Sequence, residues 1–161
     1  MTVKDVKKDP ATLSMVVTAE FDAPVERVWQ LWADPRQLER WWGPPGYPAT
    51  FVDHDLAPGG VMNYFMTSPE GDKHHAWWRV TTVDAPRSIE LVDGFGDAAD
   101  PNTDMPTTDM RVVLSDRAGG GTDMVMTSTF PSLEAMERLL EMGMDEGLRA
   151  AMSQMDDILA A

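Results

Sequence analysis

The clearest pattern in the chain is an apolar stripe at helical spacing near the C-terminus. Its members are Leu133, Met136, Leu140, Met144, Leu148, Ala151, Met155 and Ile158. Ser132 stands directly before the stripe and is a suitable N-cap. A helix of about 29 residues would be about 43 Å long. We expect this long helix to lie on a large apolar surface that covers its stripe.

Two glycines interrupt this helical pattern one turn apart, at Gly143 and Gly147. Each costs about 1 kcal/mol relative to alanine in a helix. Three explanations remain open: close approach of another backbone, room left for a ligand, and a tolerated bend.

Strand-like segments with turn signals between them occupy most of the chain before this helix. They cover residues 12–21, 47–56, 61–67, 74–83, 87–93, 108–115 and 122–130. Many short strands separated by Gly, Pro and Asp predict an antiparallel sheet. We expect residues 1–11 to form a flexible tail, residues 94–107 a long acidic loop, and residues 12–161 a single domain.

Two short helices are predicted between the first and second strands. Asp22, Ala23 and Pro24 open the first, because proline suits the start of a helix. Asp34 and Pro35 end it. A second helix is predicted over residues 36–41.

Composition narrows the classes of partner. The 161 residues carry a formal net charge of −14, which disfavours nucleic acids and anionic membrane surfaces. The absence of cysteine excludes disulfides, thiolate catalysis and zinc–thiolate sites. No apolar run is long enough for a membrane span, and residues 1–10 do not resemble a secretory signal. We expect a cytoplasmic location.

Several short motifs along the chain resemble one known superfamily. They are Ala23-Pro24-Val25-Glu26-Arg27-Val28-Trp29, Asp34-Pro35, Leu38-Glu39-Arg40-Trp41-Trp42-Gly43-Pro44, Val83-Asp84-Ala85-Pro86-Arg87, Gly119-Gly120-Gly121-Thr122 and Gly143-Met144-Asp145-Glu146-Gly147. In these segments the chain resembles the START-like (SRPBCC) superfamily. The Trp-Trp-Gly-Pro run is similar to the branch named for the activator of heat-shock protein 90 ATPase, some of whose members take part in the stress response. The resemblance covers roughly residues 12–160.

This resemblance implies an α+β helix-grip fold. Such a fold has a curved seven-stranded antiparallel sheet wrapped around a long C-terminal helix, with two short helices after the first strand. Its interior usually binds lipids, polyketides, hormones or other hydrophobic molecules. Superfamily members also include cyclases, resistance proteins and co-chaperones, and fold alone does not select among these activities.

The register of the strand at 74–83 allows two arrangements, because adjacent side chains on a strand face opposite sides. In one, His75, Trp77 and Arg79 face the interior, where the arginine and an aromatic ring could hold an anionic or carbonyl-bearing ligand. In the other, Trp78 and Val80 are buried and Arg79 is exposed. A slip of one residue exchanges the two arrangements.

Other candidates for the cavity wall are aromatic and methionine side chains. Trp41 and Trp42 could stack on a flat ligand at the entrance or simply pack against the small helices. Tyr64 could donate a hydrogen bond to a ligand, and methionine suits adaptable apolar pockets. The complete ligand-binding set is Trp41, Trp42, Tyr64, His75, Trp77, Arg79, Met110, Met124, Met126, Met136, Leu140, Met144 and Leu148.

These features favour binding of a small hydrophobic or aromatic molecule between the sheet and the C-terminal helix. A polyketide cyclase or aromatase-like enzyme using the same cavity is one alternative, and a co-chaperone-like interaction module is another. No catalytic residue, cofactor or metal ligand is assigned. A homodimer is left open.

Overall fold

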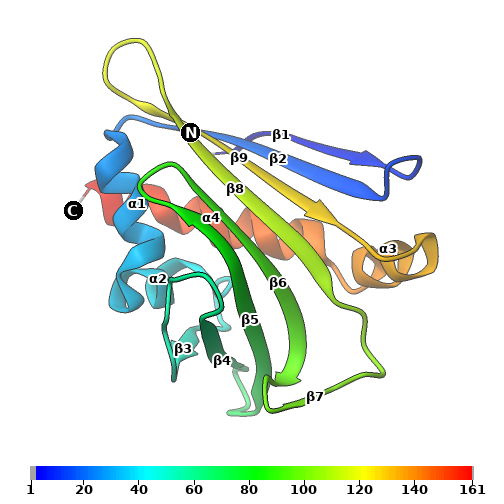
Figure 1. Ribbon diagram of the computed structural model, residues 1–161. Helices are drawn as coiled ribbons and strands as arrows, with labels where there is room; N and C mark the ends of the chain where they lie inside the picture. The colour runs from blue at the N-terminus through cyan, green and yellow to red at the C-terminus, as the bar shows by residue number, and fades with distance from the viewer. Residues whose placement is uncertain (1–2, 161) are drawn as a thin grey trace.

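A computed structural model describes residues 3–160 and shows a curved antiparallel sheet that wraps around a C-terminal helix (Figure 1). Its strands are β1 (Val3–Asp9), β2 (Ser14–Phe21), β3 (Ala49–Phe51), β4 (Val61–Thr67), β5 (Lys73–Asp84), β6 (Ser88–Asp97), β7 (Asp100–Pro101), β8 (Thr108–Asp116) and β9 (Thr122–Thr129). Its helices are α1 (Val25–Ala33), α2 (Pro35–Trp41), α3 (Leu133–Glu141) and α4 (Met144–Ala160). The predicted α+β helix-grip fold is confirmed.

The sheet is larger than expected. Residues 3–160 form nine strands rather than seven, in the order β1-β2-β9-β8-β6-β5-β4-β3, and β7 pairs with β6. The predicted flexible tail at 1–11 is therefore wrong for residues 3–9, which pair antiparallel with β2, while residues 1 and 2 lie outside the described part. The acidic loop is shorter than predicted, because β6 extends to Asp97 and turns back through β7.

Alternation along the strands separates the core from the solvent. In β2, Met15, Val17, Ala19 and Phe21 are buried while the residues between them are partly exposed. Apolar side chains at every second position thus cover the concave face of the sheet, against which the helices pack. Within residues 3–160, no helix is both long and apolar enough to cross a membrane.

The predicted single C-terminal helix is two helices. Ser132 caps α3 as predicted, since its hydroxyl accepts a hydrogen bond of 3.0 Å from the backbone N–H of Ala135. At Gly143 the backbone takes a φ of +87°, which is the left-handed conformation that ends helices. The chain then starts α4 in a new direction (Figure 1).

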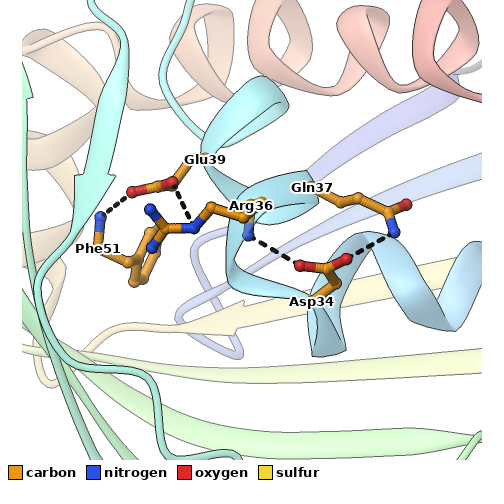
Figure 2. A network of polar contacts seen from close by, with 5 residues as sticks. All are labelled: Asp34, Arg36, Gln37, Glu39 and Phe51. Carbon is orange, nitrogen blue, oxygen red and sulfur yellow. Dashed lines mark hydrogen bonds and ion pairs between the residues drawn. The ribbon is translucent and has the colours of Figure 1, made fainter.

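A polar network holds the short helix α2 beside β3. Asp34 caps α2 by accepting hydrogen bonds from the Arg36 N–H at 2.9 Å and from the Gln37 amide at 2.9 Å. Glu39 pairs with Arg36 at 3.2 Å and accepts the Phe51 N–H at 2.7 Å (Figure 2). This network fixes α2 and therefore the position of Trp41 and Trp42 at its C-terminal end.

The C-terminal helix is tied to the same corner. The Gln154 side chain on α4 donates hydrogen bonds to the carbonyls of Gly43 at 2.7 Å and Trp41 at 3.2 Å. These contacts satisfy carbonyl groups that the end of α2 leaves without helical partners.

Candidate functional site

A cavity of about 340 Å³ lies between the concave face of the sheet and the α3–α4 segment. Most of its wall is apolar or backbone, from β4, β5, β6, β8, β9 and both C-terminal helices. The lining residues are Trp42, Pro44, Tyr64, Met66, His74, His75, Ala76, Asp93, Gly94, Phe95, Thr108, Met110, Met126, Leu139, Met142, Gly143, Met144, Gly147 and Leu148.

The break between α3 and α4 forms one side of this cavity. Gly143 and Gly147 both line it, and a Cβ atom added at either position would meet no atom within 4 Å. Of the explanations open for these glycines, close backbone approach therefore does not apply. The structure shows a bend at Gly143 and unfilled space beside Gly147.

Two polar side chains meet within the cavity wall. Tyr64 on β4 donates a hydrogen bond of 3.1 Å from its hydroxyl to Oδ1 of Asp93 on β6. Both strands pair with β5, so the two side chains reach toward each other across that strand. Tyr64 is only 4% exposed, whereas Asp93 is half-buried and lines the cavity.

Burial changes the protonation equilibria of this pair. Desolvation raises the pKa of Asp93 from 3.8 to about 7, although the hydrogen bond from Tyr64 opposes the rise. Desolvation, followed by the nearby Asp93 charge, raises the pKa of Tyr64 well above 10. The tyrosine thus stays a hydrogen-bond donor, and the carboxyl group changes charge near neutral pH.

Two tryptophans surround the pair. Trp42 and Trp78 pack edge to face with ring centroids 4.8 Å apart, and Trp42 also contacts Tyr64 edge to face. Their indole N–H groups are buried without a hydrogen-bond partner of good geometry. Both indole N–H groups nevertheless lie close enough to Tyr64 to lower its pKa, which opposes the rise that desolvation causes.

Two histidines lie at an open edge of the cavity. His74 and His75 are exposed and line it at the start of β5. Among residues 3–160, no group of three or more His, Asp or Glu side chains is arranged to hold a metal ion.

The structure brings about half of the predicted site residues together at the cavity. Those that line it are Trp42, Tyr64, His75, Met110, Met126, Met144 and Leu148. Those that do not are Trp41, Trp77, Arg79, Met124, Met136 and Leu140. Trp41 is fully buried in the adjoining core, where its indole N–H donates to the Leu31 carbonyl at 2.7 Å.

The arrangement with Trp77 and Arg79 facing the interior is wrong. Trp78 and Val80 are buried in the core, whereas Trp77 lies over the backbone of Gly94 and donates to the Phe95 carbonyl at 3.0 Å. Arg79 is exposed, and its guanidinium group lies 5.1 Å from the centre of the Trp77 ring. This pair covers the outer face of the sheet through a cation–π contact.

Sequence reasoning missed Asp93, which is the only acidic residue that residues 3–160 contribute to the cavity lining. The signal was present, because Ile89, Leu91, Asp93 and Phe95 alternate along β6 and the first two are buried. A carboxylate at an inward position of an otherwise apolar strand indicates a functional group. Because the predicted strand ended at Asp93, the inward position of this residue was overlooked.

Comparison with known proteins agrees with this fold. A family model described as Activator of Hsp90 ATPase homolog 1-like protein matches residues 22–160. No protein with a curated description matches the chain.

Solved structures of bacterial proteins are similar over nearly the whole chain. A crystal structure from Mycobacterium smegmatis is 49% identical, covers 98% of this chain and 96% of its own, and has a TM-score of 0.89. A solution structure from Arthrobacter aurescens is 48% identical, covers 99% and 92%, and has a TM-score of 0.93.

A more distant structure shares the fold alone. The AHSA1 protein of Silicibacter pomeroyi is 21% identical, covers 91% of this chain and 97% of its own, and has a TM-score of 0.71. The match of the family model over most of the chain confirms the resemblance based on the sequence motifs. The chain belongs to the family of Activator of Hsp90 ATPase homolog 1-like proteins, within the START-like superfamily.

Proposed function

We propose that this protein binds a small apolar or aromatic molecule in the cavity between the sheet and the α3–α4 segment. The observation that carries the proposal is an opening of about 340 Å³ whose mainly apolar wall contains one hydrogen-bonded polar pair. Ligand pockets of proteins commonly measure about 300–1,000 Å³ and combine apolar walls with a few placed polar groups.

Packing energetics supports this proposal. Apolar surface left in contact with water costs about 25 cal/mol per Å², so an apolar molecule that covers the cavity wall removes part of this cost. The chain keeps glycine at position 147, where a larger side chain has room. An apolar opening that keeps room beside Gly147 is suited to an apolar occupant.

Direct binding measurements test the proposal. Native mass spectrometry and tryptophan fluorescence are run against a panel of lipids, aromatic polyketides and naphthalene derivatives. Trp42 lines the cavity and Trp78 packs against Trp42, so a bound ligand should change the tryptophan emission. Failure of the whole panel to bind more tightly than millimolar would refute the proposal.

A matched pair of variants locates the binding. Gly147→Leu places a side chain where no atom lies within 4 Å and should weaken binding by at least about tenfold. Ser153→Leu adds the same side chain at an exposed position of α4 and should leave binding unchanged. Equal affinities for the two variants would place the ligand elsewhere.

A second candidate function is acid–base catalysis on the bound molecule. The observation that favours it is Asp93, whose pKa is raised to about 7, because general acids and bases work best near the ambient pH. The test is exchange of the α-protons of β-tetralone in deuterated water, followed by nuclear magnetic resonance. Acceleration that is lost in Asp93→Asn would support catalysis, and a rate equal to that of buffer would exclude it for this ketone.

A further inference from the structure

In the part of the chain that the structure describes, the carboxyl group of Asp93 has no basic partner. Within the described chain its only directly hydrogen-bonded side-chain partner is the Tyr64 hydroxyl, which donates to Oδ1 at 3.1 Å. No ion pair of residues 3–160 includes Asp93, and no lysine or arginine lines the cavity. A carboxylate accepts about four hydrogen bonds, so this donor and the nearby Trp78 indole N–H, which also acts on Asp93, leave part of its capacity unused.

The surroundings of Asp93 offer no hidden countercharge. From β5 it meets the Trp78 indole, and from β8 the cavity wall contributes Thr108 and Met110. The helices contribute apolar side chains and glycine backbone to this wall. His74 and His75 are the remaining titratable groups of the lining besides Tyr64, and they lie at the exposed edge.

Burying an unpaired carboxylate is costly, and proteins normally pair such a group with a cation or several donors. Here the Asp93 carboxylate is an acceptor without a cationic partner among the described residues, and it lies beside a cavity large enough for a ligand. The net charge of −14 attracts cations toward the protein and repels anions.

From this geometry we infer that the cavity selects ligands that carry a cationic nitrogen on an apolar or aromatic body, with the ammonium group donating to Asp93. This inference rests on the proposed binding function and adds the chemical class of the ligand. An ammonium group supplies both the charge and the donors that the carboxylate lacks. An anionic ligand of the same shape is repelled by Asp93, so the site also excludes lipids that end in a carboxylate.

The test uses three probes that share one aromatic body: naphthylmethylamine, naphthylmethanol and naphthoic acid. Their affinities are measured by isothermal titration calorimetry at about pH 8, where Asp93 is ionised and the amine is charged. We expect the amine to bind at least about tenfold more tightly than the alcohol, and the acid to bind most weakly.

Matched variants assign this preference to Asp93. Asp93→Asn should bring the affinity for the amine to within about twofold of the affinity for the alcohol. Asp109→Asn removes the same charge from an exposed position on β8 and should keep the preference.

A second measurement needs no change at Asp93. Lowering the pH from about 8 to about 5.5 protonates Asp93 and should remove most of the preference for the amine. Histidine changes charge over the same range, so the titration is repeated with His74→Gln/His75→Gln. If the loss of the amine preference at low pH persists in this variant, the loss is assigned to Asp93, and if it disappears, the inference is overturned.

The outcomes separate this inference from the proposed function. If the alcohol or the acid binds as tightly as the amine, the inference is overturned and the binding function stands. If none of the three probes binds, both are overturned for ligands of this size. A preference for the amine that persists in Asp93→Asn or below pH 6 would also overturn the inference.

Discussion

Replacing Asp93 with asparagine should stabilise the protein increasingly as the pH rises. The pKa of Asp93 is about 7 in the folded chain against 3.8 for an ordinary aspartate. The folded state therefore holds this proton more tightly than the unfolded state, and the free energy of unfolding falls as the pH rises between these two values. Asparagine has a similar shape, accepts the same hydrogen bond from Tyr64 and carries no charge to desolvate.

The size of the effect follows from the difference between the two pKa values. About three pKa units at 1.36 kcal/mol each give about 4 kcal/mol over the whole window. Because the carboxyl group faces a cavity that is large enough for water, we expect hydration to remove part of this penalty. Between about pH 5 and about pH 8, the advantage of Asp93→Asn over the wild type should grow by about 2 kcal/mol.

The assay is urea unfolding followed by tryptophan fluorescence at both pH values. The slope of the free energy of unfolding against urea concentration is compared between the wild type and the variant. Other titrating groups are the same in both chains, so their contributions cancel in the difference. Asp109→Asn serves as the control for a change in net charge and should show no growth with pH. An advantage of Asp93→Asn that stays constant from pH 5 to pH 8, or that shrinks, would refute the reasoning about burial of this carboxylate.

Three further substitutions and one deletion test how the cavity and sheet are built. Gly147→Ala should raise the free energy of unfolding by about 0.5–1 kcal/mol, because the position is helical and open. Gly143→Ala should lower the free energy of unfolding by about 1 kcal/mol, because φ is +87° at this position. Chemical denaturation measures both changes. Gly94→Ala would place a Cβ atom 2.2 Å from the Trp77 indole, so we expect a loss of about 2 kcal/mol or more and a lower melting temperature by calorimetry. Deleting residues 1–9 should expose the edge of β2 and increase self-association, as measured by analytical ultracentrifugation.

The general fold was predictable because its signals are local and repeated. Alternation of apolar residues in β2 and the capping serine of α3 appear in the chain as they do in the structure. The edge strand β1 was missed because its residues are mostly polar, and only Val3 among them is buried. Charged side chains are typical of edge strands, which discourages pairing with another chain.

The end of α3 was missed for a different reason. The apolar stripe continues across Gly143 with unchanged spacing, so periodicity alone does not reveal the break. Glycine in the left-handed conformation ends the helix, and this is the usual signal of a C-terminal cap. That break matters for function because both glycines around it line the cavity.

The register of β5 depends on a partner that is distant in sequence. Trp77 and Trp78 are equally suited to burial, and the run itself does not choose between them. Trp77 pairs with Gly94 on β6, whose missing side chain leaves room for the indole on the outer face. Arg79 follows Trp77 to that face and leaves the cavity without an arginine. A cytoplasmic location and a homodimer stay predictions from the sequence.

This register also determines the charge character of the candidate site. With Arg79 facing inward, the cavity would hold a cation and favour anionic or carbonyl-bearing ligands, as one of the two sequence interpretations expected. With Arg79 outside and Asp93 inside, the charge of the cavity wall is reversed. One glycine on a neighbouring strand would therefore separate a site for anionic or carbonyl-bearing ligands from the proposed site for amines, and comparing naphthoic acid with naphthylmethylamine distinguishes these two cases directly.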